Sequence, residues 1–250
     1  MTGIWVEITA TRGSAPRDAG TAMRVTPDRT QGTIGGGALE YRAIHTARRM
    51  LAEGSVFHEE TIPLGPGLGQ CCGGAVSLRY SDREPDEAFA EEAPALPPSR
   101  WHGKLWLWGA GHVGRAVVAA APPGSFDITW IDNARDRFPD AVPAHVAMIP
   151  AADMPLLATR ADRDADHFIF TYSHDIDLAL CAALLRRGVR SCGLIGSDTK
   201  WARFRKRLSA MGLDPSPITC PIGDKRLGKA PDRIARGVVA NLLAEDRMTA

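Results

Sequence analysis

The chain has 250 residues, of which 44% are hydrophobic and 24% are charged, and its formal net charge at pH 7 is +1. This composition is ordinary for a globular protein, and the small net charge gives no electrostatic reason to expect nucleic acid or a membrane surface as a partner. The sequence has no apolar run near the roughly 20 residues of a membrane-spanning helix, and it starts without a basic or apolar leader. We therefore expect a cytoplasmic protein.

Residues 1–80 are predicted to form a small α+β domain. Its one helix is indicated by apolar residues at helical spacing over residues 39–51, with Gly54 as a suitable stop. Its strands are expected at residues 4–10, 22–25, 56–62 and 75–80.

Residues 81–100 combine acidic side chains with prolines, which indicates a solvated linker. Residues 101–250 then alternate apolar strand-like runs with helical stretches, a pattern typical of an α/β domain with a parallel sheet and helices on both faces. Strands are expected at residues 104–108, 127–131, 145–149, 167–172 and 191–195, and helices at residues 112–121, 176–186 and 200–211.

A glycine turn follows the first strand of this Rossmann-like domain. Gly109, Gly111 and Gly114 form a G-x-G-x-x-G pattern that opens a helix, and Asp132 ends the next strand. These glycines suit a tight turn, the approach of a phosphate and close helix packing, while the carboxylate suits ribose hydroxyls. The same turn also occurs as plain scaffold or as a site for another phosphorylated ligand, so dinucleotide binding stays one of several alternatives.

A nicotinamide enzyme would also need an acid or base, and His112, His174, Asp175 and Asp177 are the candidates. His174 is the best of them because it follows a strand at the carboxyl edge, where ligands of open α/β sheets bind. The alternative is that Ser173 or a neighbouring aspartate caps the following helix and His174 merely lies in the turn.

Lys200 lies in the first turn of the helix that follows Gly196 and Ser197. A cation there opposes the helix dipole, and a bound anion would relieve the misfit. The alternative is a solvated lysine, as we also expect for the basic helical face formed by Arg203, Arg205, Lys206 and Arg207.

Two glycine-rich turns precede the helix of the first domain. Arg17 ends the first of them and could bind a phosphate with both arms of its guanidinium. Gly35, Gly36 and Gly37 form the second and offer backbone amides at a helix start, whereas Glu40 in the first helical turn favours a purely stabilising charge.

The most unusual segment is residues 64–74, in which five of the eleven residues are glycine and Gln70 precedes two adjacent cysteines. Neighbouring side chains of an extended chain point to opposite sides, so Cys71 and Cys72 are poorly placed to hold one metal together. One thiolate could coordinate a soft metal, accept sulfur as a persulfide or act as a nucleophile.

The chain has three further cysteines and no C-x-x-C pair, which argues against a secreted disulfide framework and a zinc ribbon. Cys181 and Cys192 lie in apolar runs and are expected in the core. Cys220 precedes a proline, which holds it extended, either aimed at a cleft or at the end of a strand.

Taken in order, seven segments resemble the xanthine dehydrogenase accessory proteins of the XdhC and CoxI type. They are residues 13–17, 32–40, 64–74, 109–114, 174–177, 193–200 and 220–223. The segment 171–174 departs from the family pattern because it carries Tyr172 and Ser173 between threonine and histidine.

The resemblance implies a maturation factor and not an enzyme. Such a factor binds the molybdenum cofactor (molybdopterin) as cargo, protects it while a cysteine desulfurase supplies sulfur, and inserts it into apo xanthine dehydrogenase. The alternative is an NAD(P)-dependent oxidoreductase. The oligomeric state stays open, with a homodimer as one option. The predicted cofactor-binding residues are Arg17, Gly35, Gly36, Gly37, Gln70, Cys71, Cys72, Gly109, Gly111, His112, Gly114, Asp132 and His174, with Cys71 and Cys72 at the metal.

Overall fold

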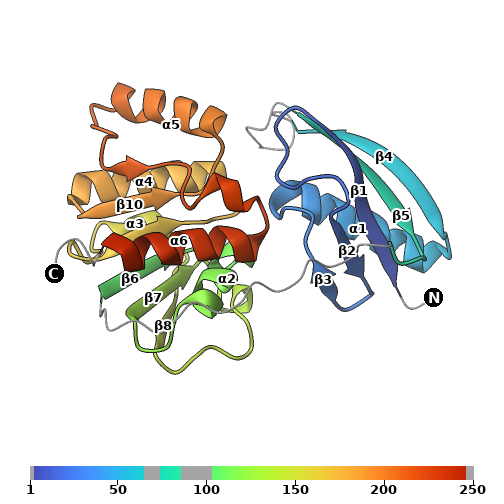
Figure 1. Ribbon diagram of the computed structural model, residues 1–250, viewed down its shortest axis with the longest axis horizontal. Helices are drawn as coiled ribbons and strands as arrows, with labels where there is room; N and C mark the ends of the chain where they lie inside the picture. Colours follow the sequence, from blue (N-terminus) through green and yellow to red (C-terminus); the bar gives the residue numbers. More distant parts are fainter. Residues whose placement is uncertain (1–2, 65–73, 86–102, 246–250) are drawn as a thin grey trace. The chain divides into compact units, whose positions relative to one another are not determined.

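The computed structural model describes residues 3–64, 74–85 and 103–245. The chain divides into two compact units, Met1–Glu92 and Ala93–Ala250, and the division falls inside the acidic segment 81–100. In Figure 1 the first unit is coloured from blue to teal and the second from green to red.

The first unit is an antiparallel sheet of five strands, in the order β3-β2-β1-β5-β4, with one helix packed on it. Its elements are β1 (Ile4–Arg12), β2 (Ala22–Val25), β3 (Thr30–Gly32), α1 (Gly37–Glu53), β4 (Phe57–Pro63) and β5 (Ala75–Ser81). The predicted helix and all four predicted strands of this unit are confirmed. The sequence did not reveal β3, because its three residues are all exposed and carry no apolar pattern.

The core of the first unit follows from alternation in β1 and helical spacing in α1. Ile4, Val6 and Ile8 are fully buried on one face of β1, and they pack with the apolar face of α1 in one cluster. The helix ends at Gly54, whose φ of 71° places it in the left-handed conformation that glycine adopts without steric cost.

The second unit is a fully parallel sheet of six strands in the order β11-β10-β9-β6-β7-β8. Its strands are β6 (Gly103–Trp108), β7 (Phe126–Asp132), β8 (Val146–Pro150), β9 (Asp166–Ile169), β10 (Ser191–Leu194) and β11 (Ile218–Thr219). Its helices are α2 (His112–Ala120), η2 (Arg135–Arg137), α3 (Met154–Ala158), α4 (His174–Arg187), α5 (Asp198–Ala210), η3 (Lys225–Leu227) and α6 (Pro231–Glu245).

Helices cover both faces of this sheet, as predicted for an α/β domain. Leu105 and Leu107 of β6 belong to the core cluster under α2 and α6, whereas Trp108 belongs to the cluster under α3, α4 and α5. Figure 1 shows α2 and α6 side by side, and the two helices are in direct contact. The fold is therefore the Rossmann-like sheet that the sequence predicts. Some details differ: β9 ends at Ile169, three residues before the predicted end, and the short helices η2, α3 and η3 were not predicted.

The order of the strands places β6 at the topological switch point. From β6 the chain continues to β7 and β8 on one side, and it returns to β9, β10 and β11 on the other. Ligands of open α/β sheets bind outside the carboxyl ends of the strands at such a point. In the described part of the chain, none of the helices is both long and apolar enough to cross a membrane.

Candidate functional site

The glycine-rich turns of the first unit meet at the end of the sheet where β1 finishes. Gly35 has a φ of +123°, and a Cβ there would lie 2.6 Å from the Cβ of Pro16. The loop 35–37 is thus packed directly on the turn that carries Arg17, whose side chain is half-buried and whose Cγ is also close to Gly35. The geometry requires glycine at this position.

The two ends of the cysteine segment lie at the same place. The amide of Leu64 donates a hydrogen bond of 2.8 Å to the carbonyl of Gly74, which closes the β4–β5 hairpin below the segment. A Cβ on Gly74 would lie 2.3 Å from the carbonyl oxygen of Arg12 and 2.5 Å from that of Ser14. The segment therefore leaves and re-enters the sheet beside the first glycine turn. Gln70, Cys71 and Cys72 themselves lie outside the described residues.

The carboxylate of Glu40 anchors the loop before α1 through hydrogen bonds. Its carboxylate is 8% exposed, and its Oε2 accepts the amides of Ile34 and Gly36 at 3.0 Å each and the hydroxyl of Thr33. The amide of Gly35 donates to the Thr33 hydroxyl at 3.1 Å. Glu40 is thus more than a charge near the helix dipole. Its carboxylate accepts the amide of Gly36, one of the backbone amides that the sequence indicated as available to a ligand.

In the second unit, the glycine turn after β6 has the tight geometry that its pattern predicts. Gly109 has a φ of +121°, and a Cβ on it would lie 2.5 Å from the carbonyl oxygen of Phe170. A Cβ on Gly114 would lie 2.1 Å from the carbonyl oxygen of Gly109, so the helix packs against the turn only with glycine there. A Cβ on Gly111 would meet open space, in keeping with a position where a ligand approaches the backbone.

Asp132 ends β7 at the predicted place, but it faces the turn. The carboxyl group is 3% exposed, and its Oδ2 accepts the amide of Ala110 at 2.6 Å. Its Oδ1 accepts the amide of Asn133 at 2.6 Å. Each oxygen keeps a further lone pair, but the carboxylate is almost fully buried, so a ribose hydroxyl has little access to it.

A contact that the sequence did not reveal crosses the switch point. The side-chain amide of Asn133, just after β7, donates to the hydroxyl of Tyr172, just after β9, at 3.0 Å. The guanidinium of Arg137 lies 4.7 Å from the centre of the Tyr172 ring, in cation–π contact. The only signal in the sequence was the departure of Tyr172 from the family pattern.

Lys200 is neither solvated nor a surface anion site, contrary to both alternatives from the sequence. Its side chain is buried, and its Nζ donates to Asp177 Oδ2 at 2.6 Å and to the carbonyl of Ile195 at 2.8 Å. The other oxygen of Asp177 accepts the Thr171 hydroxyl at 2.6 Å. The lysine side chain can fold back in this way because residue 196 is glycine. A Cβ at that position would lie only 2.7 Å from the lysine Cδ. The pair ties together the loops that follow β9 and β10.

The two candidate histidines start helices at the carboxyl edge. His112 is the exposed first residue of α2, and His174 is the half-buried first residue of α4. Ser173 caps α4 by accepting the amide of Ile176, so the predicted cap is confirmed. Burial, followed by the nearby Lys200 ammonium, lowers the pKa of His174 below its usual value. The imidazole is therefore neutral at pH 7 and could act as a proton acceptor.

The described cysteines do not form a metal centre. Cys181 and Cys192 are free and buried, as predicted, and the hydrogen bond between them together with burial raises the pKa of Cys181. Cys220 is half-buried and packs against the core cluster under α4. The residues 3–64, 74–85 and 103–245 contain no group of three or more histidine, cysteine, aspartate or glutamate side chains placed to hold a metal.

Comparison with known proteins agrees with the two-unit division. Residues 105–242 match the family model described as the XdhC Rossmann domain, and residues 2–59 match the model of the XdhC and CoxI family. The chain is similar to the uncharacterised protein YqeB of Escherichia coli K12, at 27% identity over 95% of this chain. It spans only 42% of that relative's length.

The chain also resembles a solved structure from Bacillus halodurans that is described as a xanthine dehydrogenase. The similarity covers 100% of this chain and 93% of the other, with a TM-score of 0.50 and 20% identity, and it concerns the fold alone. The Rossmann-domain match by itself spans more than half of the residues. The chain therefore belongs to the XdhC family of xanthine dehydrogenase accessory proteins.

Proposed function

We propose that this protein binds the molybdenum cofactor as cargo, protects it while it receives sulfur, and delivers it to apo xanthine dehydrogenase. The observation that carries the proposal is the meeting of three segments at one end of the first unit's sheet. There the turn with Arg17, the loop 35–37 and both ends of the cysteine segment lie in contact. Family membership supports the same conclusion.

The chemistry of this end of the sheet suits a phosphorylated cofactor with a soft metal. Cys71 or Cys72 is assigned to the molybdenum, since thiolates prefer soft centres, and Gln70 stands next to them in the chain. Because Glu40 engages the amides of Ile34 and Gly36, the phosphate is assigned chiefly to the Arg17 guanidinium.

The carboxyl edge of the second unit is the second surface assigned to a phosphorylated ligand. Gly109, Gly111 and Gly114 shape the turn, and Gly111 leaves open space beside the backbone. His112 and His174 start the two helices that flank this edge. A phosphorylated ligand other than the group held by Arg17 fits such a turn, because the amino end of a helix favours an anion.

Binding of isolated molybdenum cofactor to the purified protein tests the proposal. We expect binding by the wild type and its loss in Cys71→Ala/Cys72→Ala, while Cys220→Ala binds normally as the matched control. Equal binding by the wild type and the double variant, or no binding by either, would contradict the assignment. Activation of apo xanthine dehydrogenase by the loaded protein, with a cysteine desulfurase supplying sulfur, tests delivery separately.

An NAD(P)-dependent oxidoreductase is the second candidate, favoured by the glycine turn at the switch point. It would use Asp132 for the ribose and His174 as acid or base. Against it stands the burial of Asp132, which is only 3% exposed and whose carboxylate accepts amides of the turn itself. Titration with oxidised and reduced NAD and NADP, followed by fluorescence, separates the candidates, since tight binding with turnover of a carbonyl substrate favours the enzyme.

A further inference from the structure

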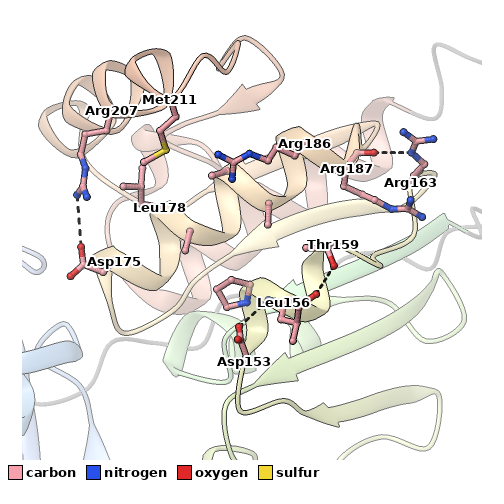
Figure 2. Close-up of a pocket in the computed structure, with 14 residues that line it drawn as sticks. Asp153, Leu156, Thr159, Arg163, Asp175, Leu178, Arg186, Arg187, Arg207 and Met211 are labelled. Carbon is pink, nitrogen blue, oxygen red and sulfur yellow. Dashed lines mark hydrogen bonds and ion pairs between the residues drawn. The ribbon is translucent and has the colours of Figure 1, made fainter.

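A groove runs along the solvent side of the helices α3, α4 and α5 in the second unit (Figure 2), with a volume of about 950 Å³. Its floor is α4, where Leu178, Ala182 and Ala183 are only 3%, 4% and 8% exposed. Ala179 is the exposed residue of this floor, and its small side chain lets a further helix approach α4 closely, near the 8–10 Å between axes that is usual for packed helices. The groove therefore has the shape of a seat for a helix.

Two large apolar side chains stand on opposite rims of the groove. Leu156 of α3 is 61% exposed, and Met211 at the end of α5 is 45% exposed. Figure 2 shows them on either side of the α4 floor. An occupant that covered both would remove apolar surface from water on each of its flanks.

The charged lining is mostly positive. It comprises Arg163, Arg186, Arg187 and Arg207 against Asp153 and Asp175. Asp153 accepts the Leu156 amide at 2.9 Å as the cap of α3. Asp175 lies 3.8 Å from Arg207, in a pair whose side chains are 90% and 56% exposed and which water screens strongly. The groove thus complements an acidic ligand.

Two of the arginines are held in place by backbone carbonyls. Arg163 Nε donates to the carbonyl of Arg187 at 2.8 Å, and Arg187 Nε donates to the carbonyl of Ala161 at 3.0 Å. A guanidinium has five N–H donors, so one bond to a carbonyl leaves others for a carboxylate. Holding these side chains beforehand reduces the entropy lost when a partner binds.

We propose that this groove binds an acidic amphipathic helix of the apo dehydrogenase. This inference rests on the proposed function, from which the partner is taken. From Asp175 to Arg187, α4 rises about 18 Å, enough to seat about three turns of a helix. Apolar residues at positions i, i+3 or i+4, and i+7 of that helix cover Leu156 and Met211, and its carboxylates pair with the arginines.

Binding of the full-length protein to apo xanthine dehydrogenase, measured by biolayer interferometry at low and high salt, tests this inference. Ala179→Trp fills the groove at an exposed position of α4, and Arg186→Glu/Arg207→Glu reverses its charge. We expect each variant to weaken the complex at least tenfold, and the charge variant to lose most of the salt dependence. Arg205→Glu/Lys206→Glu is the matched control, since it makes the same change of net charge at exposed positions of α5 outside the groove and leaves binding within twofold.

Cofactor binding by the same variants separates this inference from the proposed function. If the variants bind both cofactor and dehydrogenase as the wild type does, the docking inference is wrong and the proposed function stands. If the wild type itself fails to bind the dehydrogenase, the partner of the proposed function is wrong and the inference falls with it. Sedimentation velocity of the protein without the dehydrogenase tests a third outcome. If the wild type is a dimer there and the variants are monomers, a second copy occupies the groove and the inference is overturned.

Discussion

Asn133 and Tyr172 reach across the end of β6 to form a hydrogen bond of 3.0 Å. Asn133 follows β7 and Tyr172 follows β9, and β6 lies between these strands in the sheet. Two strand spacings amount to about 9.6 Å, a span that the two side chains bridge at the carboxyl edge, where the glycine turn also follows β6. We infer that a dinucleotide bound over this turn would meet the contact.

Removing this contact is expected to open the turn to nucleotides. The Tyr172→Ala variant loses the hydrogen bond to Asn133 and the contact with Arg137, which together contribute about 1–2 kcal/mol. Because a ligand no longer has to break these contacts, we expect the affinity for ADP-ribose to rise about tenfold. Isothermal titration calorimetry measures the change. Tyr172→Phe keeps the ring and gives a smaller gain, and Tyr41→Ala, at an exposed tyrosine of the first unit, gives none. Equal affinities of wild type and Tyr172→Ala would show that the contact does not obstruct the turn.

The buried pair of Lys200 and Asp177 is expected to matter chiefly for stability. Lys200→Met leaves the Asp177 carboxylate buried without its cation and lowers the free energy of unfolding by about 3–5 kcal/mol. Urea denaturation followed by circular dichroism measures the loss. Lys200→Met/Asp177→Leu removes both charges and recovers much of it, whereas Lys206→Met, an exposed lysine on the same helix, changes little. A double variant less stable than Lys200→Met would contradict this account.

Gly35 is expected to be irreplaceable for steric reasons beyond its backbone conformation. Gly35→Ala places a Cβ within 2.6 Å of Pro16 at a φ of +123°, and it destabilises the first unit by at least about 2 kcal/mol. Gly20→Ala is the matched control, because Gly20 also has a positive φ but a Cβ there has no neighbour within 4 Å. Thermal denaturation distinguishes the two. Equal losses would mean that the contact with Pro16 is unimportant.

The stability of the second unit is expected to fall with decreasing pH through His174. Burial and Lys200 place the folded pKa of His174 below the unfolded value of about 6.5, so the unfolded chain binds the proton more readily. The contribution of neutral His174 to the free energy of unfolding is therefore complete above pH 6.5, and it is lost as the pH falls below that value. Urea midpoints from pH 8 to pH 5 measure this loss, and His174→Asn makes the profile flatter. His167, whose pKa is also lowered by burial, leaves some dependence in that variant. A folded-state NMR titration of His174 above pH 6.5 would contradict the prediction.

The sequence predicted the parts of the fold that depend on local pattern. Apolar alternation located β1, and apolar runs located β6 and β7. The G-x-G-x-x-G string located the turn whose Gly109 and Gly114 have no room for a side chain. It did not predict contacts between distant residues. Lys200 and Asp177 are 23 positions apart and Asn133 and Tyr172 are 39 apart, so helix position alone assigned Lys200 wrongly to the surface.

Glu40 shows why residue type alone did not describe the first unit's loop. Its place in the first turn of α1 was correct, but a carboxylate there can either face water or turn back to the loop amides. The glycines before it make the second arrangement feasible, because they let the backbone present its N–H groups on one side. That choice depends on three-dimensional packing, which the local sequence does not contain.

The hydrogen bond from Leu64 to Gly74 closes the β4–β5 hairpin without the cysteine segment between them, so the pairing of these strands does not depend on that segment. Because the hairpin is closed beneath the segment, substitutions in residues 65–73 act on a part of the chain that β4 and β5 do not need for their own pairing. Loop length also changes the closing entropy only slowly. If the segment binds the cofactor as proposed, its residues can be exchanged to alter that binding while the paired strands β4 and β5 stay the same.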